Sequence, residues 1–146
     1  MKIAGLDLSY TSPAVVIEEL DDYLNVISCT GYGFAIPKWV QPNIVEYRGP
    51  KDFADDYERY KFLQDNILKW CEGCEYAFVE DYALQANGRV FNLAEFEGYI
   101  KQELYRRGTT LRFYVPSTNK KFYAGHGDAD KISMYQAWQQ WQGKKP

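Results

Sequence analysis

The 146-residue chain has one histidine, three cysteines and no long hydrophobic run. Its apolar stretches fall well short of the roughly 18 residues that a membrane-spanning helix needs. A strand-like pattern begins at residue 2, so no signal peptide is evident. The net charge is −3, so this chain does not bind polyanions through a large overall positive charge. We therefore expect a globular cytoplasmic protein, with residues 1–146 in a single domain and no membrane partner.

The few cysteines give no evident zinc site. Cys71 and Cys74 form one C-x-x-C pair, and Cys29 lies far away in the sequence. A structural zinc ion needs four ligands, so Cys29 and the single histidine, His126, would have to join the pair in the folded protein. Reduced intracellular thiols are the simpler interpretation.

Aromatic residues are abundant, at 17% of the chain, with 13 Tyr, 8 Phe and 4 Trp. Half-buried core positions are the usual place for such residues, and stacking on nucleobases is the alternative. Positive charge is local rather than general, because it gathers in Arg106-Arg107, Lys120-Lys121 and Lys144-Lys145.

Hydrophobic periodicity predicts an α/β protein. Three antiparallel strands are expected at the start of the chain, over 2–8, 14–19 and 24–29. Residues 34–52 contain three prolines and no clear period, and are predicted to form a long loop. The later elements are predicted as strands over 75–81 and 111–115 and helices over 53–72, 91–107, 117–123 and 130–142. Because strand–helix–strand connections are normally parallel, we expect a mixed five-stranded sheet flanked by helices.

Two of these helices show an apolar stripe at helical spacing. The stripe of the first helix is formed by Phe53, Tyr57, Tyr60, Leu63, Ile67, Trp70 and Cys71. The stripe of the second helix is formed by Leu93, Phe96, Ile100 and Leu104. Both stripes are expected to pack into the core, and the second helix also has enough apolar surface to take part in a dimer interface.

Two carboxylates stand out against apolar strands. Asp7 lies inside the run IAGLDL, which is typical of a buried strand, and Glu80 lies near the end of EYAFVED. A buried ionised carboxylate is strongly unfavourable unless something pairs with it. If the two strands are neighbours, Asp7 and Glu80 face one another, and a divalent cation relieves their repulsion. Mg²⁺ prefers such oxygen ligands, and a two-metal site suits phosphodiester chemistry.

A simpler interpretation of both residues stays open. Asp7 can accept backbone hydrogen bonds in the turn over residues 9–12, and Glu80 can be a solvated strand end. Asp81 should point to the opposite face of its strand and is more plausibly structural or solvated.

The order and spacing of three segments resemble the RuvC-like Holliday-junction resolvases of the ribonuclease H-like superfamily, particularly the phage-encoded ones. "IAGLDLSYTSPAVVI" resembles the first strand with its catalytic Asp, the turn and the second strand. "YAFVEDYALQANGRVFNLAEFEGYI" resembles the segment with the catalytic Glu and the helix after it. "VPSTNKKFYAGHGDADKISMYQAW" resembles the segment with two functional lysines, a glycine-rich turn and a helix.

The resemblance implies a homodimeric endonuclease that cuts four-way DNA junctions with Mg²⁺ or Mn²⁺, two ions per site, in the cytoplasm of a cell or of a phage host. Asp7 and Glu80 match the first two metal-binding carboxylates. Lys120 and Lys131 match the pair of lysines near the scissile phosphate and the DNA backbone. The resemblance and the local sequence further suggest DNA contacts from Tyr82, Asn87, Arg89 and Lys121. Taken alone, Lys120 and Lys131 would be ordinary exposed helix lysines.

The sequence departs from the family pattern at its end. The family has two further acidic residues on a final helix, whereas no Asp or Glu follows Asp130 here. We expect that the chain lacks that helix. The two alternatives are that Asp128 or Asp130 substitutes for the missing acids, or that the protein binds junctions without cutting them. Capping of the last helix is the favoured role of the two aspartates. His126 is either a general base, a phosphate contact or, most simply, an exposed loop histidine.

Three other functions remain open. A junction-binding protein without catalysis is favoured by the missing acidic pair. A related nuclease acting on other branched DNA or on RNA–DNA hybrids would share the same carboxylates. An actin-like or sugar-kinase ATPase has a similar first strand, but it needs two such domains and 146 residues are too few.

Overall fold

The computed structural model describes residues 1–9, 12–35, 38, 41–47, 49–81 and 90–142, the last with side chains to residue 140. These residues divide into two compact units. The first comprises the described residues of Met1–Val79 and Ala86–Arg112, and the second those of Glu80–Gln85 and Phe113–Pro146. Each unit is considered in turn.

Within the described ranges, the strands form a mixed six-stranded sheet in the order β4-β3-β2-β1-β5-β6. Its strands are β1 (Lys2–Asp7), β2 (Ala14–Leu20), β3 (Val26–Ala35), β4 (Ile44–Glu46), β5 (Tyr76–Glu80) and β6 (Thr110–Tyr114). The first three strands form the predicted antiparallel meander. β1 also pairs with β5 in parallel, as a right-handed crossover would give. The mixed α/β sheet is confirmed, with one strand more than predicted.

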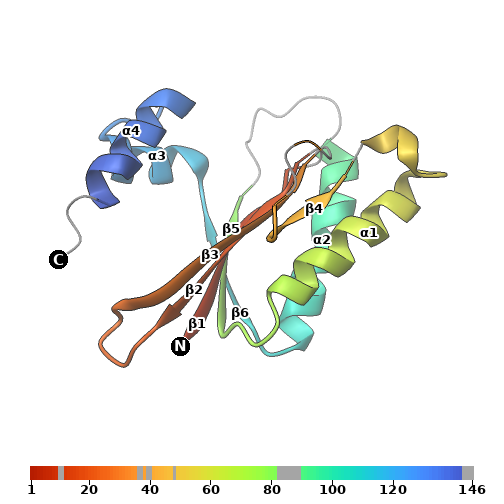
Figure 1. Ribbon diagram of the computed structural model, residues 1–146, viewed down its shortest axis with the longest axis horizontal. Helices are drawn as coiled ribbons and strands as arrows, with labels where there is room; N and C mark the ends of the chain where they lie inside the picture. The colour runs from red at the N-terminus through yellow and green to blue at the C-terminus, as the bar shows by residue number, and fades with distance from the viewer. Residues whose placement is uncertain (10–11, 36–37, 39–40, 48, 82–89, 143–146) are drawn as a thin grey trace. The chain divides into compact units, whose positions relative to one another are not determined.

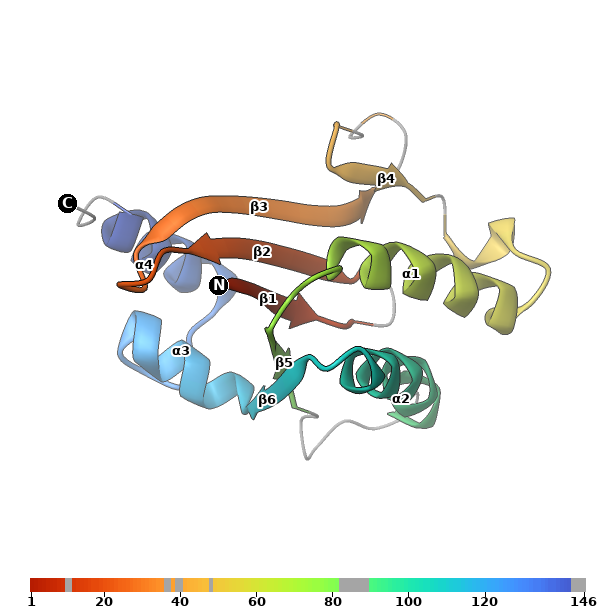
Figure 2. The same ribbon diagram turned by 90° about the horizontal axis from the view of Figure 1, so that it is seen from below.

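Two helices, α1 (Asp56–Trp70) and α2 (Val90–Arg106), lie side by side on one face of the sheet, as Figures 1 and 2 show. Side chains of β1, β2 and β5 alternate between this face and the other. Those that point toward the helices are buried, and they are Ala4, Leu6, Val15, Ile17, Ala77 and Val79. The core of the first unit therefore lies between the sheet and the helix pair.

The two predicted apolar stripes supply the helical side of this core. Phe96, Ile100 and Leu104 of α2 are almost completely buried, as are Leu63 and Ile67 of α1. Two members of the first stripe are placed differently from the prediction, since Phe53 precedes α1 and Tyr57 is exposed. Tyr57 is 67% exposed, because it lies in the first turn of α1; its hydroxyl donates to Glu95 at 3.4 Å.

The prediction of a structureless loop over 34–52 is wrong in part. β3 runs on to Ala35, and β4 pairs with it in parallel, with Gly33 opposite Ile44. Tyr47 follows β4 and is nearly buried, with its ring against Phe34 and Phe53 at centroid distances of 6.1 and 5.9 Å. A three-residue strand is too short to show alternation, so these aromatic contacts could not be read from the pattern.

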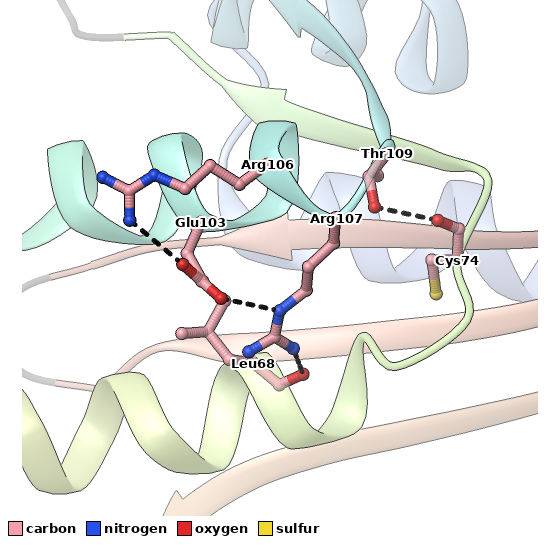
Figure 3. Close-up of polar contacts among 6 residues, drawn as sticks. All are labelled: Leu68, Cys74, Glu103, Arg106, Arg107 and Thr109. Atoms are coloured by element: carbon pink, nitrogen blue, oxygen red, sulfur yellow. Dashed lines mark hydrogen bonds and ion pairs between the residues drawn. The ribbon is translucent and has the colours of Figure 1, made fainter.

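Polar contacts join the end of α2 to the end of α1 and to the residues before β5 (Figure 3). Arg107 donates from Nη1 to the carbonyl of Leu68 at 3.1 Å and from Nε to Glu103 at 3.0 Å. Thr109 donates from its buried hydroxyl to the carbonyl of Cys74 at 2.9 Å. These contacts fix the chain where it leaves each helix, so that β5 and β6 begin in register.

Replacing Thr109 by valine tests how much this junction contributes. Thr109→Val keeps the shape but leaves the buried Cys74 carbonyl without its hydroxyl donor, which we expect to lower the free energy of unfolding by about 1–3 kcal/mol. Urea denaturation followed by circular dichroism measures the change. The neighbouring Thr110 is exposed and gives the matched control, Thr110→Val. Equal stability of Thr109→Val and wild type would show that the hydroxyl contributes nothing.

The second unit contains a helical hairpin formed by α3 (Pro116–Ala124) and α4 (Lys131–Gln142). Ala129, in the turn between them, is fully buried. None of the side chains of α3, and none of those described for α4, is buried. The hairpin therefore leaves most of its side-chain surface open to solvent.

No helix in the part of the chain that the structure describes is both long and apolar enough to cross a membrane.

Candidate functional site

The two carboxylates singled out from the sequence follow paired positions on neighbouring parallel strands. Leu6 of β1 pairs with Val79 of β5. The next residues along these strands are Asp7 and Glu80, which are the last residues of β1 and β5. The carboxyl ends of parallel strands are where ligands bind in α/β sheets. The first and fourth predicted strands are therefore neighbours, which is the condition on which the expectation for Asp7 and Glu80 depended.

The apolar run suggested that the Asp7 carboxylate is buried, but in the structure it is at the surface. Its side chain is exposed, while Leu6 and Leu8 on either side of it are buried. Because side chains alternate along a strand, the last residue of β1 points away from the core. The Asp7 carboxylate accepts a hydrogen bond from the backbone N–H of Ser9 at 3.2 Å. This is the turn contact expected under the simpler interpretation, and it leaves Oδ2 with no contact that the structure describes.

Lys120 and Lys131 both belong to the second unit, on different helices. Lys120 lies in α3 and is half-buried, and Lys131 is the exposed first residue of α4. Lys121, in the last turn of α3, is exposed as well. The chain therefore has three ammonium groups on this hairpin, each with a long flexible side chain suited to contact phosphates.

The glycine-rich turn between these helices is built by specific contacts. Gly125 has a positive φ of 86° and ends α3, a conformation that favours glycine. A Cβ on Gly127 would lie 3.2 Å from the carbonyl oxygen of Ser117, so a side chain there would crowd the start of α3. Both glycines thus have a geometric role in a turn that the sequence suggested was merely flexible.

Each of the two aspartates in this turn has a partner. Asp130 accepts from the backbone N–H of Ser133 at 2.7 Å, which is the helix-capping role that was favoured for it. This bond is the main reason why the pKa of Asp130 lies below its ordinary value. Asp128 lies 2.9 Å from Nδ1 of His126, and that bond, with a smaller contribution from the charge of Lys120, lowers the pKa of Asp128.

The His126–Asp128 pair is the contact that sequence reasoning missed. The His-x-Asp spacing was its only signal, and such spacing in a turn does not show which way the side chains point. The Asp128 carboxylate contacts one nitrogen of the ring, Nδ1, and so restricts how the imidazole is oriented. The interpretation of His126 as a lone exposed loop residue is therefore incomplete.

The residues present partly fit a divalent cation. Asp7 and Glu80 offer the hard oxygen ligands that Mg²⁺ prefers, and Mg²⁺ is commonly held by one or two carboxylates together with substrate phosphates. Among the residues that the structure describes, no three His, Cys, Asp or Glu side chains gather to hold a metal ion by themselves. The donor set therefore suits a cation that the substrate helps to bind.

The C-x-x-C pair is unsuited to metal binding. Cys71 and Cys74 are buried free thiols, and burial raises the pKa of Cys71 to about 12. The thiolate is the ligand form, so a raised pKa disfavours binding, and among the described residues no third His, Cys, Asp or Glu joins the pair. Both cysteines lie in the core, so packing accounts for the pair.

The predicted DNA contacts Tyr82, Asn87 and Arg89 lie outside the described residues.

The fold is shared with solved resolvase structures. Thermus thermophilus RuvC matches 100% of this chain and 82% of its own, at 19% identity and a TM-score of 0.63. T. thermophilus RuvC in complex with a Holliday junction substrate matches over the same shares, at 18% identity and a TM-score of 0.65. Fowlpox virus resolvase in complex with substrate Holliday junction DNA matches 99% of this chain and 75% of its own, at 13% identity and a TM-score of 0.53.

No protein-family model matches the chain, and no curated protein sequence does. At identities below 20%, the structural likeness establishes the fold, which is that of the RuvC-like resolvases. The fold that the resemblance implied is thereby confirmed.

Proposed function

We propose that this chain is a metal-dependent, structure-selective endonuclease that resolves four-way DNA junctions by paired phosphodiester hydrolysis. The pairing of Leu6 with Val79 carries the proposal, because it brings Asp7 and Glu80 to matching ends of adjacent strands. The proposal is supported by the fold, since solved proteins with this fold include resolvases in complex with Holliday junctions.

In this proposal Asp7 and Glu80 hold Mg²⁺ or Mn²⁺, with two ions per site. When bound, such ions stabilise the negative charge that develops on the phosphodiester oxygens. The Ser9 N–H bond to Asp7 keeps one carboxylate oxygen in place and leaves the other to bind. A carboxylate held in one orientation loses less entropy when it binds a cation.

Lys120, Lys121 and Lys131 are proposed to bind the phosphate backbone. Such contacts position the DNA and make binding sensitive to salt. Tyr82, Asn87 and Arg89 remain proposed DNA contacts from their place in the sequence. The protein is proposed to act in the cytoplasm, which is that of the host cell if a phage encodes the chain.

A four-way junction has two-fold symmetry, so paired cleavage suits a homodimer. The outer surface of α2 is the proposed contact between the two copies. Phe91, Tyr99 and Tyr105 are 86%, 47% and 75% exposed there, which is unusual for large side chains with so much apolar surface.

Junction binding without cleavage is the second candidate function. It is favoured because Asp7 and Glu80 are only two carboxylates. Among the described residues, no group of three His, Cys, Asp or Glu side chains could hold a metal ion. The capping bond of Asp130 and the His126 contact of Asp128 give those two residues other roles.

Cleavage of a synthetic four-way junction, compared with a linear duplex and an RNA–DNA hybrid of matched sequence, tests the proposal. We expect symmetric nicks in the junction alone, with Mg²⁺ or Mn²⁺ and not with EDTA. A gel shift in Ca²⁺ separates binding from cutting. Tight junction binding without nicks would support the second function, and preferred cutting of the hybrid would assign the chain to a different nuclease class. Equal affinity for junction and duplex, without cutting, would contradict both candidates.

A further inference from the structure

α4 carries an exposed pair of aromatic rings that the proposed nuclease chemistry does not use. Tyr135 and Trp138 are 57% and 49% exposed. Their rings stack, with centroids 5.9 Å apart and an angle of 27° between the planes. Large aromatic side chains normally pack into a core, so two stacked rings in solvent indicate a binding surface.

A lysine lies on the same face of this helix. Lys131 precedes Tyr135 by one helical turn and Trp138 by two, a spacing that places the three side chains in one row. Lys131 is exposed as well. We call Lys131, Tyr135 and Trp138 the α4 aromatic surface.

The charge of α4 favours a polyanionic partner. The helix has the sequence KISMYQAWQQWQ, with one positive charge and no acidic residue, although the chain as a whole has 20 Asp and Glu. The nearest carboxylates precede the helix, where Asp128 contacts His126 and Asp130 caps the helix at Ser133. No carboxylate on α4 therefore repels a phosphate.

We propose that the α4 aromatic surface binds unpaired bases of a DNA strand, which stack on Tyr135 and Trp138 while Lys131 contacts the adjacent phosphate. Stacking tolerates any base, because every base has a π-face. The inference rests on the proposed function and names the part of a branched substrate that this helix takes. The exposed Gln139, beside Trp138 on the helix, adds a hydrogen-bonding group that suits bases and sugars better than an apolar protein surface.

Fluorescence anisotropy with a labelled oligothymidine of about 15 nucleotides tests the inference. We expect Tyr135→Ala and Trp138→Ala each to weaken binding about tenfold. Tyr135→Phe keeps the ring and should bind as wild type does. Tyr23→Ala is the matched control, because Tyr23 is 87% exposed in an acidic turn of the first unit. The same substitution there should leave affinity unchanged.

A salt titration separates the two kinds of contact. Lys131→Gln should lower the slope of log affinity against log salt concentration by about one, because one phosphate contact is lost. The aromatic variants should bind more weakly at every salt concentration with the slope unchanged. Loss of affinity in Tyr135→Phe equal to that in Tyr135→Ala would show that the hydroxyl binds and not the ring, and would overturn stacking.

Three further results would overturn the inference: wild-type affinity in both alanine variants, no measurable affinity of wild type for oligothymidine, or a wild-type dimer that Trp138→Ala turns into a monomer without loss of affinity. The last would assign the surface to a second copy of the chain. None of these depends on whether the wild type cuts junctions, so failure of the inference and failure of the proposed function are distinguishable.

Discussion

Asp7→Asn is expected to slow junction cleavage by about 10³-fold or more while junction binding persists. Asparagine has the same shape, and its oxygen can still accept the hydrogen bond from Ser9, so the turn after β1 should survive. The negative charge is lost, and with it one of the two charged ligands proposed for the cation. Single-turnover cleavage of a labelled junction measures the rate, and a gel shift in Ca²⁺ measures the affinity.

The control for this variant is another exposed carboxylate on the same sheet. Glu19→Gln removes a charge from β2 opposite Lys2, whereas Asp7 is opposite Ala14 at the other end of the strand pair. Glu19→Gln should cleave at the wild-type rate. Wild-type cleavage by Asp7→Asn would remove Asp7 from the proposed site. Equal loss in both variants would show that general surface charge is responsible rather than one ligand.

Phe96→Ala is expected to lower the free energy of unfolding by about 3–5 kcal/mol. The Phe96 side chain is 1% exposed in the core, and its ring lies 5.7 Å from that of Tyr60 on α1. Removing it leaves a cavity between α1 and α2 in addition to the lost transfer free energy. The backbone carbonyl of Phe96 also accepts from the buried Gln64 amide, so a shift of the helix would disturb a buried hydrogen bond.

The same substitution at an exposed position of the same helix gives the comparison. Phe91 is 86% exposed, so at protein concentrations where the chain is monomeric Phe91→Ala should change the free energy of unfolding by less than about 0.5 kcal/mol. Urea denaturation at several protein concentrations measures both variants. If the homodimer forms, the wild-type midpoint will rise with protein concentration. Similar losses in the two variants would contradict the assignment of Phe96 to the core.

The parts of the fold that could be predicted depend on long runs of local pattern. The apolar run of the first strand indicated a buried strand, in which Ala4 and Leu6 are buried, and helical spacing identified Phe96, Ile100 and Leu104 on one stripe. These signals persist over six or more residues, so chance interruptions do not erase them. They also indicated parallel strand pairs, because a strand–helix–strand connection favours parallel strands, but which strands are neighbours, such as β1 and β5, was not predicted.

Other features depend on contacts that no local pattern contains. β4 has three residues, and the contacts of Tyr47 with Phe34 and Phe53 join segments that are separate in the sequence. The exposure of Asp7 depends on which face of the sheet its side chain points to at the end of β1, and the apolar run around it does not show that face. The stacking of Tyr135 on Trp138 at an exposed helix face likewise depends on what covers that face, which spacing alone does not show.

The pairing of β1 with β5 also has a consequence for the order of folding. β1 to β3 are consecutive hairpin partners, so a growing chain can close them early at little entropic cost. The other edge of β1 stays open until Tyr76–Glu80 has been synthesised, because Ile3 pairs with Tyr76. A nascent or truncated chain that ends before β5 would expose this edge to pairing with other chains. Completion of the sheet thus closes an aggregation-prone edge and assembles the carboxylate pair in the same late step.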